Sequence, residues 1–248
     1  MNQEQLYSLK QEASLIERWK NQDEIDNKSK YIIDYINTTS KEEVSLAELS
    51  VGDGYFSTFL LKNVKNLKNI NYSDISEFRL KQISDFIETE MSQYSKKVTL
   101  TQCNFDYDFE KIHSNYFDYV IAIDILEHVF DVFGFVEHCN RILVKGGVLF
   151  LRVPNIAYIK HIVNLILGRQ VVTSSWFGKK GDFSSWKNKD GWDGGHLHNF
   201  TISSLFELLK IYNFKILHCN ELSGRFSNLR QVNPNLFFAN PLITAIKC

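Results

Sequence analysis

Short apolar runs alternate with segments of helical periodicity from residue 44 onwards, and this alternation restricts the fold more than any other feature of the chain. We expect strands at Val44–Leu49, 69–73, 98–103, Phe117–Ile123, 148–153, 214–218 and 242–246. We expect the main helices at 55–61, 133–143 and 203–212, with a further helix that ends near residue 87. Such alternation builds a mostly parallel sheet with helices on both faces, and ligands bind such sheets beyond the carboxyl ends of the strands.

The first 43 residues precede this alternation and are predicted to form an N-terminal helical cap on a main domain of residues 44–248. Apolar side chains recur at three- and four-residue steps between residues 6 and 19, and a second helix is expected at about 25–36. A simpler interpretation, in which both helices only add to the core, fits the same pattern.

The composition is that of a globular protein, and it excludes several classes of partner. A net charge of -1 argues against a long nucleic acid, because a polyanion is best held by a strongly basic surface. No apolar run reaches the ~18 residues of a membrane span. The four cysteines form no CxxC pair and the first residues are polar, so we expect a cytoplasmic protein without a metal site. The abundance of Asn, Lys, Ile and Phe indicates a bacterial source, and the sequence leaves the oligomeric state open.

A glycine turn follows the first expected strand. Gly52 and Gly54 lie where that strand turns into a helix, so the backbone can approach a ligand closely. Asp74 ends the second strand, twenty residues beyond Gly54, where a carboxylate can accept both ribose hydroxyls of a nucleoside. Glu48 and Asp74 each have a simpler interpretation, as a solvated strand-end carboxylate and as a helix N-cap.

Six segments together resemble the motifs of class I S-adenosylmethionine (SAM)-dependent methyltransferases, and they follow the family's order over about residues 44–220. The segment 48–54 resembles the family's acidic-x-Gly-x-Gly-x-Gly motif. The other segments are 72–76 (YSDIS), Asn104-Phe105, 117–128 with its DILEH end, 141–147 (RILVKGG) and 195–201 (GHLHNFT). The last of these resembles a segment of the family's small-molecule branch.

The resemblance implies a Rossmann-like class I methyltransferase fold with an antiparallel last strand, and SAM as the cofactor with S-adenosylhomocysteine as the product. It places Glu48 near the methionine ammonium, Asp74 at the ribose, and Asn104 and Phe105 around the adenine. The full set of expected cofactor-binding residues is Glu48, Ser50, Gly52, Gly54, Tyr55, Asp74, Ile75, Asn104, Phe105 and Asp124. Two of them depart from the family pattern, since Ser50 replaces a glycine and Asn104 replaces the commoner aspartate.

Two other functions fit parts of the pattern. An NAD(P)-dependent oxidoreductase would use Gly52 and Gly54 as a degraded dinucleotide fingerprint, but Asp53 would then repel the pyrophosphate. A SAM-binding partner without catalytic activity is the second alternative, because Ser50 and Asn104 both change the cofactor motifs.

Methyl transfer from a sulfonium needs placement of the acceptor, and it needs a base only where the acceptor must lose a proton. The candidate catalytic residues are His128, His196 and His198, with Asp124 nearby in the sequence. His196 and His198 are two residues apart, so an extended backbone would direct them to one side. A metal site with Asp193 lacks a third ligand at a convincing spacing, and we predict none. The simpler interpretations are a helix-entry histidine at 128 and loop histidines packed on Trp192.

Residues 156–195 are predicted to form a lid inserted in the main domain. An amphipathic helix opens this segment, and three of the four tryptophans follow it among lysines and glycines. Aromatic faces and cations suit a small polar acceptor, such as a sugar or a phosphate derivative. With the family resemblance, this composition favours the methylation of a surface (capsule) polysaccharide precursor on oxygen or nitrogen. An ordinary solvated loop anchored by its tryptophans is the alternative.

Overall fold

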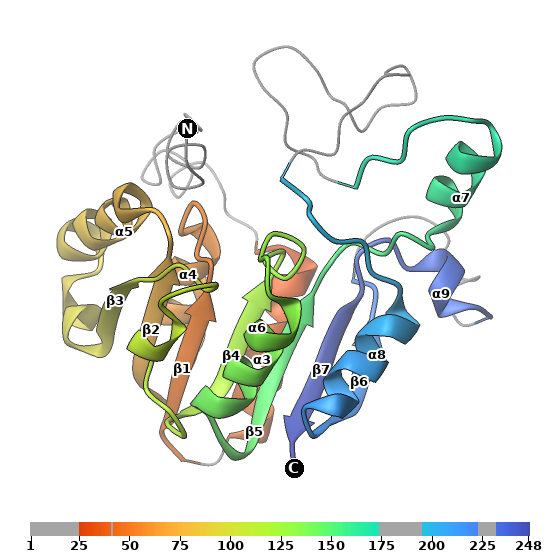
Figure 1. Ribbon diagram of the computed structural model, residues 1–248. Helices are drawn as coiled ribbons and strands as arrows, with labels where there is room; N and C mark the ends of the chain where they lie inside the picture. Colours follow the sequence, from red (N-terminus) through yellow and green to blue (C-terminus); the bar gives the residue numbers. More distant parts are fainter. Residues whose placement is uncertain (1–24, 41, 174–194, 223–231) are drawn as a thin grey trace.

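The computed structural model describes residues 25–40, 42–173, 195–222 and 232–248 and contains a seven-stranded sheet (Figure 1). The strands are β1 (Val44–Leu49), β2 (Leu67–Asp74), β3 (Val98–Gln102), β4 (Phe117–Ile123), β5 (Leu143–Arg152), β6 (Phe214–Asn220) and β7 (Leu242–Lys247). Their order is β3-β2-β1-β4-β5-β7-β6, and β7 runs antiparallel to both β5 and β6. The predicted α/β fold with an antiparallel last strand is therefore confirmed.

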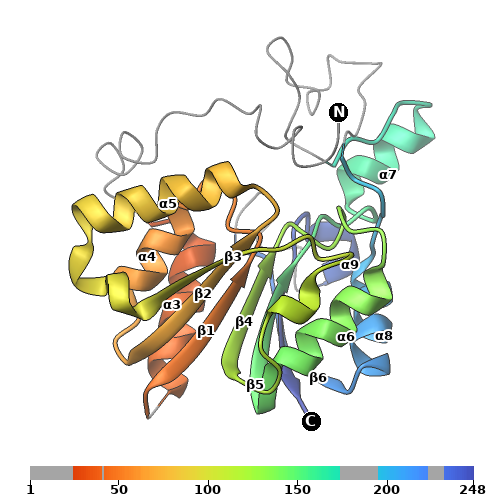
Figure 2. The same ribbon diagram turned by 60° about the vertical axis from the view of Figure 1, so that its left-hand side comes forward.

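Helices cover both faces of the sheet, as Figures 1 and 2 show. One face carries α3 (Asn27–Thr39), α4 (Tyr55–Asn63) and α5 (Glu77–Glu90), and the other carries α6 (Val132–Ile142) and α8 (Ile202–Ile211). The shorter helices are η1 (Ser92–Lys97), η2 (Phe109–Lys111), α7 (Ile159–Ile166) and α9 (Pro234–Phe237). Alternate strand residues face opposite cores: Leu46 packs with α3 to α5, whereas Ala47 and Leu49 pack with α6 and α8.

The helix α3 belongs to the layer that covers the sheet. Asp26 caps its first turn by accepting a hydrogen bond from the Ser29 N–H at 2.8 Å. Ile32, Ile33 and Ile36 recur on one face and are buried against the sheet. This helix therefore packs on the core of the sheet. The helix predicted at 6–19 lies outside the described residues.

We expected the fifth strand to begin at residue 148, directly after the glycine pair at 146–147, and this start was wrong. β5 begins at Leu143, and the pair lies within it, where the register against β4 shifts between Phe117 and Tyr119. Gly146 has a φ of 77°, which allows the irregularity without leaving the strand. A Cβ at Gly147 would lie 2.9 Å from the Val144 carbonyl oxygen, so the backbone packs too closely there for a side chain.

The amphipathic helix expected at the start of the predicted lid is α7. Residues 174–194, which hold its three tryptophans, lie outside the described part of the chain. None of the described helices is both long and apolar enough to span a bilayer.

Candidate cofactor and acceptor site

The glycine turn after β1 is held by the neighbouring strand. Ser50, Gly52 and Gly54 all have positive φ, at 63°, 60° and 74°. The N–H groups of Ser50 and Val51 donate to the carbonyl oxygen of Ser73 at 2.8 and 3.2 Å. The turn is thereby fixed at the carboxyl edge of the sheet, which is the upper edge in Figure 1.

Asp74 locks this turn from the end of β2. One carboxylate oxygen accepts from the Gly52 N–H at 3.0 Å, and the other accepts from the Ser76 N–H at 2.9 Å. Burial raises the pKa of Asp74, whereas these hydrogen bonds and the charge of Arg79 lower it. The Ile75 N–H also bonds to this carboxylate, and since a carboxylate offers about four lone-pair sites, it can still accept from a ligand hydroxyl. The following residue, Ile75, is half-buried.

Glu48 is the second buried carboxylate at this edge. Its Oε2 has no hydrogen-bond partner among the described residues, although the side chain is only 4% exposed. Burial raises the pKa of Glu48 to about 8, and the nearby Ser57 hydroxyl and Lys28 ammonium act in the opposite direction. A buried carboxylate that lacks a donor is matched by a cationic or N–H group of a ligand. This is the arrangement expected beside a methionine ammonium.

The start of α4 is capped by the protein itself. The Asp53 carboxylate accepts a hydrogen bond from the Tyr55 N–H at 3.0 Å, and Tyr55 is the first residue of the helix. In a dinucleotide enzyme this helix end would present free N–H groups to a pyrophosphate. A negatively charged side chain that already occupies one of them disfavours that use. Among the described residues, the atom nearest to a Cβ built at Gly52 is the Arg79 guanidinium, at 3.8 Å.

The loop after β3 carries Asn104 and Phe105. The Asn104 side-chain oxygen accepts from the Asp106 N–H at 3.0 Å, which stabilises a turn. Phe105 is buried, and its ring packs edge-on against Phe135 with the centroids 5.6 Å apart. The ring is therefore a core element, and a contact of this residue with a ligand would use its backbone.

Asp106 joins the loops after β3 and β4. A single carboxylate oxygen accepts hydrogen bonds from the N–H groups of Phe130 and Asp131, at 2.8 and 3.0 Å. Asp131 is in turn the N-cap of α6 and accepts from Gly134 at 2.8 Å. The two loops that border the site on this side are thus held together by one side chain, which the sequence analysis did not single out.

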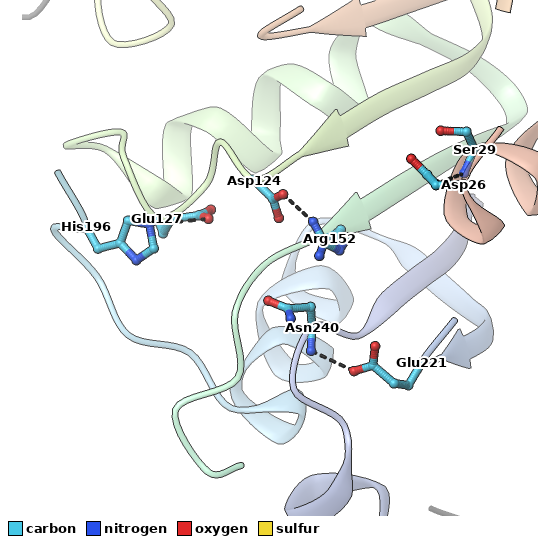
Figure 3. A network of polar contacts seen from close by, with 8 residues as sticks. All are labelled: Asp26, Ser29, Asp124, Glu127, Arg152, His196, Glu221 and Asn240. Atoms are coloured by element: carbon cyan, nitrogen blue, oxygen red, sulfur yellow. Dashed lines mark hydrogen bonds and ion pairs between the residues drawn. The ribbon is translucent and has the colours of Figure 1, made fainter. Parts of the chain in front are cut away.

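Asp124 directly follows β4 and pairs with Arg152 at the end of β5 (Figure 3). Asp124 has a positive φ of 53°, and its N–H donates to the Arg152 carbonyl oxygen at 2.9 Å. Its side chain is 43% exposed, and that of Arg152 is 19% exposed. A carboxylate and a guanidinium therefore lie side by side at the edge where ligands bind, and Arg152 was not predicted.

His128 and His196 come together, whereas the sequence pattern had grouped His196 with His198. The rings of His128 and His196 meet edge to face with centroids 4.7 Å apart. The buried Glu127 lies beside them, with its Oε1 4.0 Å from the His196 Nε2 (Figure 3). Two backbone hydrogen bonds bring the segments together, because the N–H groups of Leu197 and His198 donate to the Glu127 carbonyl oxygen at 2.8 and 3.3 Å.

The tautomer of His128 follows from its partner. Its Nδ1 lies 2.6 Å from the carbonyl oxygen of Gly195, which can only accept, so in the neutral ring the Nδ1 carries the hydrogen and the Nε2 carries the lone pair. The His196 Nδ1 contacts the Thr173 hydroxyl at 2.6 Å. The His198 Nε2 is buried without a hydrogen-bond partner among the described residues.

Comparison with known proteins identifies the family. A family model described as a methyltransferase domain matches residues 22–219. This chain belongs to the methyltransferase domain family. The match includes α3 and extends to β6, so it covers both the cofactor edge and the histidine segment. No curated protein matches the chain.

Solved structures of the same fold agree with this assignment. A SAM-dependent methyltransferase from Mesorhizobium loti is 14% identical with a TM-score of 0.59, covering 88% of this chain and 96% of that one. A putative SAM-dependent methyltransferase from Listeria monocytogenes is 14% identical with a TM-score of 0.59, covering 89% of this chain and 98% of that one. The CurJ carbon methyltransferase is 14% identical with a TM-score of 0.58, covering 98% of this chain and 57% of that one. These structures share the fold of this chain. The family match confirms the predicted methyltransferase, and the family implies SAM as the cofactor.

Proposed function

We propose that this chain transfers a methyl group from SAM to an oxygen or nitrogen atom of a small polar acceptor. Glu48, Asp74 and Asn104 would hold the methionine, ribose and adenine portions of SAM, in that order along β1, β2 and β3. The observation that carries the proposal is the Glu48 carboxylate, which is buried at the glycine turn with an oxygen that lacks a donor among the described residues. It fits an ammonium ligand.

The acceptor would bind beside the ends of β4 and β5. SAM supplies an activated methyl group, so the acceptor atom bonds to the methyl carbon as the carbon–sulfur bond breaks, the electron pair stays on sulfur, and the acceptor loses its proton. Asp124 and Arg152 offer a carboxylate and a cation for a polar acceptor. His128 and His196 lie beside each other, on the loop after β4 and the segment before α8, and would orient the acceptor's proton-bearing atom or accept its proton.

The class of acceptor is supported by charge and by the predicted lid. Arg152 would orient an anionic group such as the phosphate of a sugar derivative, and the lysines at 179, 180, 187 and 189 have the charge for the same role. We propose a sugar or phosphate derivative of a surface-polysaccharide precursor in a bacterial cytoplasm, with no nucleic acid or membrane as partner. Because one of the similar structures is a carbon methyltransferase, the experiment below also determines which atom of the acceptor is methylated.

Calorimetry with SAM and with NADH, followed by a turnover assay, tests the proposal. We expect SAM to bind and NADH not to bind. We also expect S-adenosylhomocysteine to appear only when a sugar or sugar phosphate acceptor is added, with the methyl group located on oxygen or nitrogen by mass spectrometry. Binding of SAM without turnover on any acceptor panel would indicate a non-catalytic SAM-binding partner, and binding of NADH alone would indicate an oxidoreductase.

A further inference from the structure

Glu127, His128 and His196 form a cluster of potential metal ligands at the acceptor side of the site. One ligand atom from each of them lies within 4.8 Å of the other two. Glu127 is 1% exposed, so its carboxylate is held among protein atoms rather than in solvent. Two of the three come from consecutive positions after β4, and the third comes from the segment that precedes α8.

Both histidines are oriented by a second hydrogen bond. The Gly195 carbonyl oxygen fixes the Nδ1 of His128, and the Thr173 hydroxyl contacts the Nδ1 of His196 at the same distance of 2.6 Å. In the neutral His128 ring this hydrogen bond assigns the lone pair to the Nε2, and the Nε2 of His196 lies 4.0 Å from the Glu127 carboxylate. Metal-binding histidines characteristically have their other ring nitrogen bonded to a carbonyl, carboxylate or similar group in this way.

We propose that Glu127, His128 and His196 bind one divalent first-row transition-metal ion and that this ion holds the acceptor oxygen. Two imidazoles and one carboxylate suit Mn²⁺, Fe²⁺, Co²⁺ or Zn²⁺ better than Mg²⁺ or Ca²⁺, which prefer oxygen ligands throughout. Three protein ligands leave coordination positions open, as in metal sites that bind a substrate. The role given to the acceptor oxygen rests on the proposed function, whereas binding of the ion does not.

The geometry allows the ion with small side-chain movements. Ligands at about 2.0–2.2 Å from a tetrahedral ion are about 3.4 Å apart, and the Oε1 of Glu127 lies 4.0 Å from the Nε2 of His196. Rotation about side-chain bonds closes such a gap without moving the backbone. The backbone itself is fixed, because the Glu127 carbonyl oxygen accepts two hydrogen bonds from the His196 segment.

No metal site was expected from the sequence, because the pair His196 and His198 lacked a third ligand at a convincing spacing. The structure replaces that pair with His128 and His196 and supplies Glu127 as the third member. Glu127 belongs to the DILEH segment, but its sequence position alone shows neither its burial nor its distance from residue 196. Asp193, the other ligand considered, lies outside the described residues.

Metal titration of the full chain tests the site directly. After removal of metal with a chelator, Co²⁺, Mn²⁺ and Zn²⁺ are titrated by calorimetry, and the visible absorption of bound Co²⁺ reports nitrogen coordination. We expect one ion per chain, and at least about tenfold weaker binding in Glu127→Gln and His196→Ala. Thr173→Val, which removes no buried charge, should bind about tenfold more weakly, because the hydroxyl contacts the His196 Nδ1 at 2.6 Å and orients the ring. His113→Ala, at an exposed histidine near Tyr116, is the matched control and should bind normally.

The outcomes separate this site from the proposed function. The absence of a single tight site in the wild type, or equal affinity in folded Glu127→Gln, His196→Ala and wild type, overturns the metal site. If methyl transfer then proceeds at an unchanged rate in chelator, the proposed function stands without it. One bound ion that is lost in the variants supports the site, even where SAM fails to bind and the proposed function falls.

Discussion

Ser50 holds a backbone conformation that glycine adopts more easily. Its φ of 63° lies in the left-handed region, which costs a residue with a Cβ roughly 1–2 kcal/mol. The serine replaces the glycine of the family motif, so the chain keeps the turn at the expense of local strain. That strain is offset by the two hydrogen bonds that residues 50 and 51 donate to Ser73.

Ser50→Gly should therefore leave the stability unchanged or raise it by up to about 1 kcal/mol. The relief of strain exceeds the extra entropy that glycine gives the unfolded chain. Urea unfolding measures the change. Asn213→Gly is the control, because Asn213 has a similar φ of 58° but asparagine tolerates this region well. A clear loss of stability in Ser50→Gly would show that the hydroxyl makes a contact worth more than the strain.

Glu48 should make the ligand-free protein less stable as the pH rises. Its pKa is about 8 in the folded state against an ordinary value of 4.5, so the folded protein keeps a proton that the unfolded chain releases. The penalty is absent below pH 4.5, grows between 4.5 and 8, and is complete above 8. Glu48→Gln should be more stable than wild type at pH 8, on the order of a few kcal/mol, and similar at pH 4.5.

Urea unfolding at several pH values gives this difference directly. Glu88→Gln, an exposed position on α5, is the control and should follow the wild-type curve. If Glu48→Gln and wild type show the same pH dependence, the carboxyl does not titrate as its burial implies. Addition of SAM should reduce the wild-type penalty, because a cationic ligand favours the charged carboxylate.

Asp74 connects the glycine turn after β1 to the second strand, so its removal should weaken SAM binding in a protein that still folds. Asp74→Ala loses the acceptor for the Gly52 N–H and the proposed ribose contact. Hydrogen bonds to a charged group contribute about 1.5–3 kcal/mol, so we expect at least about tenfold lower affinity. Calorimetry measures it, with Asp85→Ala on the exposed face of α5 as the control. Unchanged affinity in folded Asp74→Ala would remove this residue from the cofactor site.

Among the elements, the loops after β3 and β4 depend on each other through Asp106. Asp106→Ala should leave two N–H groups, of Phe130 and Asp131, without their acceptor and cost about 1–2 kcal/mol. Hydrogen exchange at these two amides should accelerate, and SAM affinity should fall because Asn104 shares the loop. Asp108→Ala, which breaks only an exposed ion pair with Lys111 and one weak contact, should change exchange little. Unaltered hydrogen exchange at the amides of residues 130 and 131 in Asp106→Ala would show that Asp106 does not couple the two loops.

The strands could be predicted because their apolar runs are bounded by turn residues. β1 and β4 have the predicted bounds, since each apolar run is followed by a polar loop. The glycine pair in β5 was misplaced, because glycine marks a bulge as well as a turn and only the register against β4 distinguishes the two. Strand order has no local signal, so the place of β7 between β5 and β6 required the structure.

The residues of the site that lie at strand ends could be predicted from the sequence. The contacts between segments that are far apart in the sequence could not. Glu48, Gly52 and Asp74 belong to strand ends next to a glycine turn, and the structure places them together as expected. A spacing of two residues gave the side on which His196 and His198 could lie but not the partner of either. The contact of His196 with His128 arises from backbone pairing with Glu127, which no spacing reveals.

At the scale of the whole molecule, two cores share one sheet. The core under α3 to α5 and the core under α6 and α8 are formed by alternate residues of the same strands. The glycine turn at 50–54 lies between β1 and α4, at the carboxyl edge of the sheet. A disturbance of either core therefore acts on the same strands, and we expect the sheet and both helical layers to unfold together.

Matched substitutions in the two cores test this cooperativity. Leu205→Ala on α8 and Ile83→Ala on α5 each remove a fully buried side chain, one from each face, and should each lower the free energy of unfolding by about 2–5 kcal/mol. Both variants should show a single transition by circular dichroism and by tyrosine fluorescence. SAM at 100 times its Kd should add about 2.7 kcal/mol to each variant, because a ligand that binds only the folded protein stabilises the whole cooperative unit. Two transitions in either variant, or stabilisation by SAM of only one of them, would mean that the halves of the sheet unfold independently and that the cofactor belongs to one half alone.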